Sequence, residues 1–251
     1  MARVFTGGSS QYLSRSSAFV TAYPLSFFAW VYPTDATAIY RGMTIAATSG
    51  VSYLQLALRG DLSGDPVETY VDDGSAPTPT ASVSGFTANA WNCVGCVHLN
   101  ATSHTVYCNG SSATSTTSKA FPTASQFSIA RGFYAGTAYY DSATSRWAYA
   151  ALWNAALDAQ ECAALAARYH PRMVRPSSLV SSWDLGGFAG ENDKDFVGGY
   201  DLTATNSPTW ADSPGIIWPD DDGDVVTAAG STAKPWLYSR RGARLIGGGL
   251  S

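Results

Sequence analysis

Cleavage of glycosidic bonds is the first chemistry to test, because it needs two carboxylates on one face of a strand. A three-acid strand, Glu-x-Asp-x-x-Glu, is typical of one class of such enzymes. The nearest candidate, Glu191-Asn192-Asp193-Lys194-Asp195-Phe196, lacks the last carboxylate and is flanked by glycines. Glu68 and Asp72 fall on one face of a predicted strand but have no third acid. We therefore predict that the protein is not an enzyme of this kind.

Motifs for nucleophilic catalysis and for phosphate binding are also missing from the sequence. There is no G-x-S-x-G turn to expose a serine, and no G-x-x-x-x-G-K-[ST] or G-x-G-x-x-G loop to hold phosphates. The three histidines, His98, His104 and His170, are too few and too scattered to indicate a catalytic triad. The sequence predicts a protein without catalytic residues and without an organic cofactor.

The cysteines and one histidine form a pattern that could bind a metal. Cys93 and Cys96 have the spacing of a C-x-x-C motif, but residues three apart on a strand point to opposite faces. Cys96 and His98 share a face, and Cys108 lies across an expected hairpin, so a zinc site is one alternative. The favoured alternative is that the cysteines are small buried thiols and that the histidine lies on the surface.

A run of aspartates near the C-terminus is a second candidate metal site. Asp220, Asp222 and Asp224 belong to the run Asp-Asp-Asp-Gly-Asp, which superficially resembles a calcium-binding loop. The run lacks the bidentate glutamate and the spacing of a complete loop, so a solvated acidic linker is the favoured interpretation. Calcium held by these three carboxylates is the alternative.

The composition limits the elements that can carry these residues. Of the 251 residues, 45% are hydrophobic and only 14% are charged, whereas amphipathic helices need many charged residues on their solvent face. Aromatic residues make up 13%, and there are 24 glycines and 12 prolines. This composition favours many short strands joined by turns.

Charge and hydropathy argue against two classes of partner. The formal net charge is −4, whereas nucleic-acid binding needs a basic surface, so we expect no nucleic-acid partner. No apolar run approaches the roughly 18 residues that indicate a transmembrane helix. The N-terminal residues enter strand-like sequence without a signal-peptide pattern, so we expect synthesis in the cytoplasm and reduced cysteines.

Turn signals separate strand-like segments along most of the chain. These segments are rich in aromatic and β-branched residues and span 24–33, 43–47, 51–59, 68–71, 91–99, 105–108, 127–131, 146–153, 179–185 and 200–204. One helix is predicted over residues 158–169, where Asp158 and Glu161 form a capping-box pair. Many short strands with a single helix predict an all-β sandwich or barrel.

Three segments, in order, resemble the laminin-G-like, concanavalin A-like lectin family. The first consists of Phe5–Leu13 followed by Phe27–Pro33, and the second of Trp91–Val97 followed by the hairpin Val106–Gly110. The third is Trp147–Asp158. The resemblance covers residues 3–170 and implies a concanavalin A-like jelly-roll β-sandwich of two antiparallel sheets. Closing strands in this family often carry an acidic residue that helps to hold calcium. Here Ala-Tyr-Ala occupies those positions, so we do not expect that calcium site.

A later segment resembles an arm that follows the lectin-like unit in many bacteriophage and prophage structural proteins. It consists of RPSSLVSSWDL at 175–185 and DFVGGYDLT at 195–203. The resemblance implies a component of a virion, assembled in the host cytoplasm. We accordingly divide the chain into a jelly roll over residues 1–175, an additional strand arm packing on the sandwich over 176–215, and an extended acidic-then-basic tail over 216–251.

Two groups of residues are candidates for binding. Tyrosines expected in loops could stack on sugar rings, although packing is the favoured alternative; they are Tyr134, Tyr139 and Tyr140. The segment 235–246 combines aromatic residues with arginines, which dominate protein–protein interfaces. Its candidate partner-binding residues are Trp236, Tyr238, Arg240, Arg241 and Arg244.

The function that the sequence favours is a non-enzymatic virion protein, either a capsid decoration protein or a tail-associated component. Its expected partners are other virion proteins, further copies of the chain and host-surface glycans. The first alternative is a carbohydrate-binding adhesion module. A glycoside hydrolase or lyase of the jelly-roll class is the less favoured alternative, because the carboxylate strand is missing.

Overall fold

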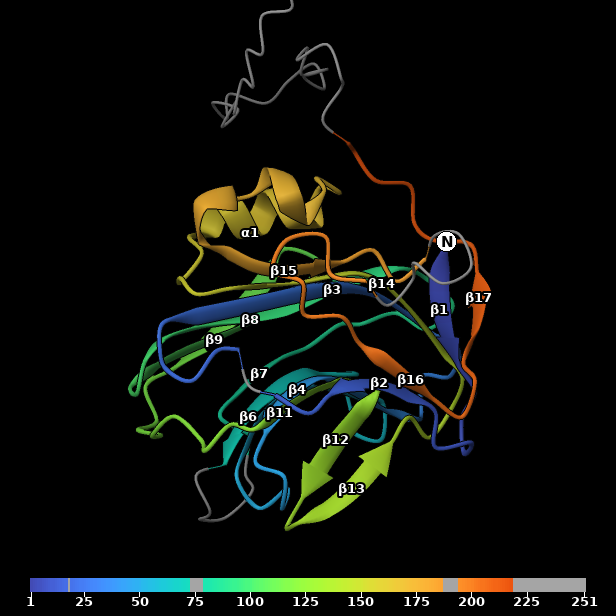
Figure 1. Cartoon of the computed structure of the whole chain (residues 1–251), viewed down its shortest axis with the longest axis horizontal. Helices are drawn as coiled ribbons and strands as arrows, with labels where there is room; N and C mark the ends of the chain where they lie inside the picture. The colour runs from blue at the N-terminus through green and yellow to red at the C-terminus, as the bar shows by residue number, and fades with distance from the viewer. Residues whose placement is uncertain (18, 73–78, 187–193, 219–251) are drawn as a thin grey trace, which may run out of the picture.

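Two antiparallel sheets lie face to face in the computed structural model, and a single short helix covers one of them (Figure 1). The structure describes residues 1–17, 19–72, 79–186 and 194–218. Sheet A has the strand order β10-β9-β8-β3-β14-β1-β17, with β15 also paired to β14. Sheet B has the order β16-β2-β11-β4-β5-β6-β7. The predicted all-β sandwich of two antiparallel sheets is confirmed.

Each sheet combines strands from distant parts of the chain. The strands of sheet A are β1 (Ala2–Phe5), β3 (Leu25–Pro33), β8 (Asn92–Asn100), β9 (Ser103–Cys108), β10 (Ser111–Ser115), β14 (Ser145–Trp153), β15 (Leu179–Trp183) and β17 (Thr209–Ala211). Those of sheet B are β2 (Tyr12–Arg15), β4 (Ile39–Ala46), β5 (Tyr53–Arg59), β6 (Val67–Asp72), β7 (Ala81–Val83), β11 (Gln126–Ile129) and β16 (Thr203–Thr205). The edge strands β10 and β17 were not predicted, because neither has an alternation of apolar and polar residues.

The main core fills the space between the sheets. Alternate residues of the central strands point inward, so the core contains large side chains from both layers, among them Phe27, Leu54, Phe127, Trp147 and Trp183. A second core lies on the outer face of sheet A, beneath the helix. Central strands of sheet A are therefore apolar on both faces, which explains their continuous aromatic and β-branched sequence.

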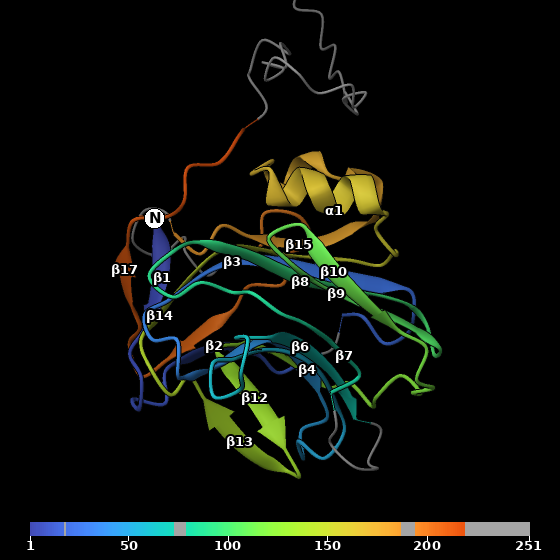
Figure 2. The same cartoon turned by 180° about the vertical axis from the view of Figure 1, so that it is seen from behind.

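The helix α1 (Ala159–Ala166) lies on the outer face of sheet A, as both views in Figures 1 and 2 show. Its predicted capping box is present, because the Asp158 carboxylate accepts the Glu161 N–H and the Glu161 carboxylate accepts the Asp158 N–H. The helix ends at Ala166 rather than Tyr169. Arg168 adopts φ 72°, and the Tyr169 N–H bonds the Ala164 carbonyl, which is the pattern of a Schellman motif without glycine.

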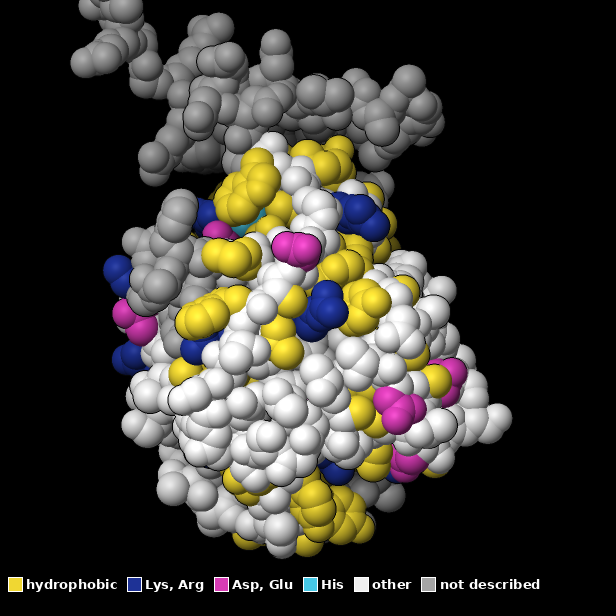
Figure 3. Space-filling view, turned by 90° about the vertical axis from the view of Figure 1, so that its right-hand side faces the viewer, with side chains coloured by type: hydrophobic (Ala, Val, Ile, Leu, Met, Phe, Trp, Pro, Cys, Tyr) yellow, Lys and Arg dark blue, Asp and Glu magenta, His cyan; other side chains and the backbone are white. Residues whose placement is uncertain are grey.

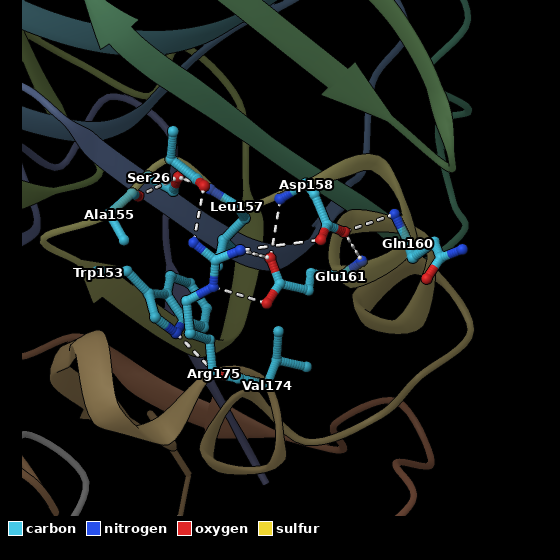
Figure 4. A network of polar contacts seen from close by, with 10 residues as sticks. Ser26, Trp153, Ala155, Leu157, Asp158, Gln160, Glu161, Val174 and Arg175 are labelled. Carbon is cyan, nitrogen blue, oxygen red and sulfur yellow. Dashed lines mark hydrogen bonds and ion pairs between the residues drawn. The ribbon is translucent and has the colours of Figure 1, made fainter. Parts of the chain in front are cut away.

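Arg175, the first residue of the segment that resembles the phage arm, links this helix to the residues that follow β14 by hydrogen bonds (Figure 4). Its guanidinium donates to both carboxylate oxygens of Glu161, at 2.7 and 2.5 Å, and to the Ala156 carbonyl at 2.9 Å. Nearby, the Trp153 indole N–H donates to the Val174 carbonyl at 2.8 Å. The helix, the end of β14 and the start of the arm therefore form one unit.

The segment after Arg175 completes both sheets. β15 pairs with β14, β16 with β2 and β17 with β1. The turn between β15 and β16 is organised by Asp195, whose buried carboxylate accepts backbone N–H groups from four residues, at 2.9 to 3.1 Å: Ser182, Val197, Gly198 and Tyr200. A Cβ on Gly198 would lie 2.4 Å from the Val180 carbonyl oxygen, which is too close for any side chain. The turn therefore requires both the aspartate and the glycine of the segment DFVGGYDLT.

Replacing this carboxylate should destabilise the whole sandwich. We expect Asp195→Ala to lower the free energy of unfolding by about 2–4 kcal/mol, because several buried backbone N–H groups lose a charged acceptor. Urea unfolding measures this change. Asp212→Ala, which removes an exposed acid near β17, is the control and should change stability by less than about 0.5 kcal/mol. Equal effects of the two substitutions would contradict the assigned role of Asp195.

Candidate functional site

A β-hairpin on the outer face of sheet B carries the tyrosines that the sequence singled out (Figure 2). It consists of β12 (Arg131–Tyr134) and β13 (Thr137–Tyr140). Ala135 and Gly136 form its two-residue turn, with φ 47° and 81°. Two successive positive φ values are typical of a type I′ turn, although alanine is an unusual first residue. The expectation that these tyrosines lie in loops is wrong, since that turn was not recognised.

The hairpin is fixed to the sheet by packing and by one buried hydrogen bond. The Phe133 ring is buried in a small cluster on the outer face of sheet B, with Ala46, Tyr53, Ala57 and Tyr70. The Phe133 N–H donates to the Gln55 side-chain oxygen at 2.8 Å. A Cβ on the neighbouring residue, Gly132, would lie 2.0 Å from the same oxygen, so only glycine permits this approach. The tyrosines are therefore presented on an anchored strand pair.

Four tyrosines lie on the two faces of this hairpin, Tyr134 with Tyr139 on one face and Tyr140 with Tyr12 on the other, and together we call them the tyrosine platform. The rings of Tyr134 and Tyr139 meet edge to face at 6.4 Å and are the most open, with exposures of 49% and 41%. Tyr140 stacks on Tyr12 at 5.6 Å. Hydrophobic side chains accordingly gather at the foot of Figure 3, at the height of the hairpin in Figure 1. The structure thus brings together all three predicted tyrosines and adds Tyr12, which sequence reasoning missed.

Two arginines lie against the platform. The Arg41 guanidinium carbon is 5.2 Å from the centre of the Tyr139 ring, and that of Arg131 is 4.2 Å from the centre of Tyr12. Arg131 also donates to the Gln126 side-chain oxygen at 2.7 Å. Such cation–π contacts stabilise the ring positions and leave a positive charge beside each face of β13. Arg41 belongs to β4 and Arg131 to β12, which are far apart in the sequence. No sequence motif therefore connects them with the tyrosines.

A shallow polar depression of about 500 Å³ begins two residues from Tyr12 along β2. Hydroxyl, carboxylate and guanidinium groups line it, from Ser14, Arg15, Ser16, Ser17, Asp201 and Thr203. The Arg15 guanidinium donates to the Ser17 hydroxyl at 2.6 Å and lies over the Tyr200 ring at 5.2 Å. The tyrosine platform offers aromatic ring faces, and the polar depression beside Tyr12 offers groups that can bind hydroxyls.

The strand-borne carboxylates are not part of this surface. Glu68 and Asp72 of β6 are only 4% and 3% exposed. Glu68 accepts hydrogen bonds from the Tyr70 hydroxyl and the Arg59 guanidinium, which fixes its position. Glu191 and Asp193 of the other acidic candidate lie outside the described residues.

Cys96, His98 and His104 form a buried chain of polar contacts. His98 was expected on the surface, but it is completely buried because β8 lies between β3 and β9 with this side chain facing sheet B. Its Nδ1 lies 2.8 Å from the Nδ1 of His104, and its Nε2 lies 3.1 Å from the Cys96 sulfur. All four cysteines are buried and unpaired. Among the residues that the structure describes, no three potential ligands converge on one point.

The remaining sequence candidates lie outside the described residues. They are the aspartates Asp220, Asp222 and Asp224 and the partner-binding residues Trp236, Tyr238, Arg240, Arg241 and Arg244. The helix of the described structure is too short and too polar to cross a membrane.

Comparison with known families identifies the fold. Residues 6–163 match the family model described as the concanavalin A-like lectin/glucanases superfamily. The chain belongs to this superfamily. The match confirms the expected concanavalin A-like jelly roll, and members of the superfamily include both lectins and glucanases by its description. A search of curated proteins finds no match.

Solved structures of the same fold are distant in sequence. The chain is similar to the native heptameric SAP-like pentraxin from Limulus polyphemus, with 13% identity over 83% of this chain and 93% of that one, and a TM-score of 0.54. It is also similar to the HCR/D W1238A mutant, with 10% identity over 65% and 41% of the two chains and a TM-score of 0.50. At such identities the likeness shows the superfamily fold alone.

Asp141 anchors the end of the hairpin through a buried carboxyl group. One of its oxygens accepts the Arg41 backbone N–H at 2.6 Å, and the other accepts the hydroxyl of Ser145. Ser145 in turn accepts the Trp147 indole N–H at 2.9 Å. Burial raises the pKa of Asp141 to about 7, from an ordinary value near 3.8. The protonated form is therefore favoured in the folded protein.

This pKa makes a pH-dependent contribution to stability. Asp141 holds its proton more tightly in the folded state than in the unfolded state. It therefore stabilises the fold at low pH, and this stabilisation is lost as the pH rises from about 3.8 to about 7. Asp141→Asn stays neutral, so its stability relative to the wild type should rise by on the order of 1 kcal/mol per pH unit between pH 5 and 7. Chemical unfolding of both proteins across this range measures the difference. Burial lowers the pKa of His98 to about 3, so His98 makes the fold less stable at low pH. Both proteins contain His98, so its effect does not contribute to the difference between them. Parallel pH profiles would contradict the assignment.

Proposed function

We propose that the protein is a non-enzymatic carbohydrate-binding module that holds glycans on the tyrosine platform. The observation that carries the proposal is the convergence of Tyr134, Tyr139 and Tyr140 on one anchored hairpin. An aromatic ring offers an apolar face to the C–H face of a sugar, while its hydroxyl stays available for a hydrogen bond. Exposed aromatic residues on a rigid support cost little ordering on binding. The superfamily, which includes lectins, is consistent with this role.

The positions of three carboxylates support binding without cleavage. Both retaining and inverting glycosidases need two carboxyl groups that reach the scissile bond. Glu68 and Asp72 are buried, and Glu68 is already hydrogen-bonded to Arg59 and Tyr70. Asp141 is buried beneath the hairpin and bonded to Ser145. These positions support a module that binds a glycan and leaves it intact.

Glycan-array screening of the full chain, followed by calorimetry, tests the proposal. We expect Tyr139→Ala and Tyr134→Ala each to weaken glycan binding about tenfold, which corresponds to about 1.4 kcal/mol for a lost stacking face. Trp210→Ala removes an equally exposed ring from sheet A and should leave binding unchanged. Absence of glycan binding, or binding indifferent to both tyrosines, would contradict the proposal. Release of reducing sugar by the purified protein would reject its non-enzymatic part.

The second proposed role is that of a bacteriophage virion component, attached to capsid or tail proteins through the end opposite the hairpin. Its support begins with the resemblance of residues 175–203 to the phage arm. Large apolar side chains near the last described residue are between 41% and 44% exposed: Phe196, Val197, Ile217 and Trp218, of which Phe196 and Trp218 both lie 5.0 Å from the Arg172 guanidinium. Some are held rigidly, since Trp218 stacks on His170 at 4.0 Å and the Arg172 guanidinium lies 5.0 Å from the Trp218 ring. Contiguous exposed apolar residues of this kind mark interaction surfaces.

Attachment is tested by removing the segment 230–251, which contains Trp236, Tyr238 and Arg240. We expect the truncated chain to keep its melting temperature, because the strands of both sheets and the helix all precede the removed segment. It should no longer copurify with particles in a density gradient. A matched variant, Leu62→Ser, alters an exposed apolar residue elsewhere and should copurify normally. Normal incorporation of the truncated chain would contradict this role of the tail.

A further inference from the structure

The arginines of the chain differ in whether they have a carboxylate partner. Arg59, Arg172 and Arg175 are paired with acids, to Asp61 at 2.7 Å, to Asp184 at 3.3 Å and to Glu161 at 2.5 Å. Arg41 and Arg131, which lie against the tyrosine platform, form no ion pair within the described part of the chain. Among the described residues, no carboxylate therefore forms an ion pair with either guanidinium of the platform.

The Arg41 side chain forms fewer hydrogen bonds than that of Arg131. Its Nε is buried without a partner, and its guanidinium forms no hydrogen bond with any described residue. The contact that it does make is the ring of Tyr139. The terminal nitrogens of this half-buried guanidinium are therefore available to an acceptor brought by a ligand.

Arg131 shows the same pattern on the other side of the hairpin. One of its terminal nitrogens donates to Gln126, and its Nε is buried without a partner. Its guanidinium lies over Tyr12, which stacks on Tyr140. Because Tyr139 and Tyr140 are successive residues of β13, they point to opposite faces. Each face of the strand thus combines an aromatic ring with an arginine that has no ion pair among the described residues.

The nearest acids are already committed to other groups. Asp141 bonds the Arg41 backbone N–H and the Ser145 hydroxyl, not the guanidinium of Arg41. Glu68 bonds Arg59 and Tyr70. Neither carboxyl group forms an ion pair or a hydrogen bond with the guanidinium of Arg41 or Arg131.

We infer that the glycan bound at the platform is acidic, and that Arg41 and Arg131 recognise its carboxylate or sulfate group. This inference rests on the proposed carbohydrate binding and narrows it to one chemical class. A planar guanidinium donates two parallel hydrogen bonds to a carboxylate or a sulfate, while the adjacent tyrosine ring contacts the sugar itself. Neutral sugars offer the ring contact but not the anion.

The test compares acidic glycans with neutral glycans of the same backbone. Immobilised sialylated, uronate-containing and sulfated oligosaccharides, each beside its desialylated, reduced or desulfated counterpart, are probed with the full chain. We expect at least tenfold tighter binding to acidic members, decreasing as salt is raised. Separate carboxylate and sulfate series identify which anion is preferred.

Arginine variants assign the preference to the platform. Arg41→Gln and Arg131→Gln should each reduce the ratio of acidic-glycan to neutral-glycan affinity at least threefold. Arg41→Lys and Arg131→Lys keep the charge, and so should retain part of the preference, even where a glutamine variant fails to fold. Arg146→Gln is the matched control, because Arg146 lies 4.7 Å from the Tyr32 ring on sheet A, away from the platform.

The outcomes separate this inference from the proposed function. Equal binding of neutral and acidic glycans, weakened by the tyrosine substitutions, would overturn the acidic specificity and leave the carbohydrate-binding role intact. An acidic preference that Arg146→Gln reduces as much as Arg41→Gln and Arg131→Gln would overturn the assignment to these two arginines. Absence of binding to every glycan would reject both proposals.

Discussion

The stack of Trp183 on Phe127 is the contact on which the sandwich depends, because it joins the two sheets across the core. Trp183 belongs to β15 of sheet A and Phe127 to β11 of sheet B, and their rings lie 5.0 Å apart and nearly parallel. The Trp183 indole N–H donates to the Tyr200 carbonyl, so the same residue also fixes the turn that Asp195 organises. Losing a fully buried tryptophan costs about 3–5 kcal/mol, comparable to the net stability of a small domain.

This contact also explains why the late segment is part of the sandwich. The family match ends at residue 163, yet Trp183 comes from β15 and is completely buried in the main core. Strands β16 and β17 then cover one edge of each sheet. Covered edges protect a β-sandwich from unwanted pairing with other chains. Strands β15, β16 and β17 therefore serve the stability of the jelly roll itself.

Core and tyrosine platform are coupled through a single strand. β11 carries Phe127 in the core, and the chain turns at Ala130, with φ 62°, into β12 of the hairpin. The Ser128 hydroxyl donates to the Arg131 carbonyl at 2.9 Å across this corner. Packing around Phe127 thus determines where the hairpin leaves the sheet. Figure 1 places that hairpin at the end of the molecule opposite the segment that follows β17 and ends at residue 218, so the two proposed binding surfaces would not obstruct each other.

The sequence by itself determined the fold class and the local features that short-range physics controls. Segments rich in aromatic and β-branched residues between turn signals predicted most of the strands, and Asp158 with Glu161 predicted the start of the helix, since both patterns depend only on neighbouring residues. The sequence also singled out the three tyrosines, but not their arrangement. Tyr12, Arg41 and Arg131 join them only through pairing between strands distant in sequence, and the burial of His98 depends on the strands that flank β8. Such juxtapositions arise from register and sheet order, which no local pattern encodes, so the tertiary structure alone decided the site.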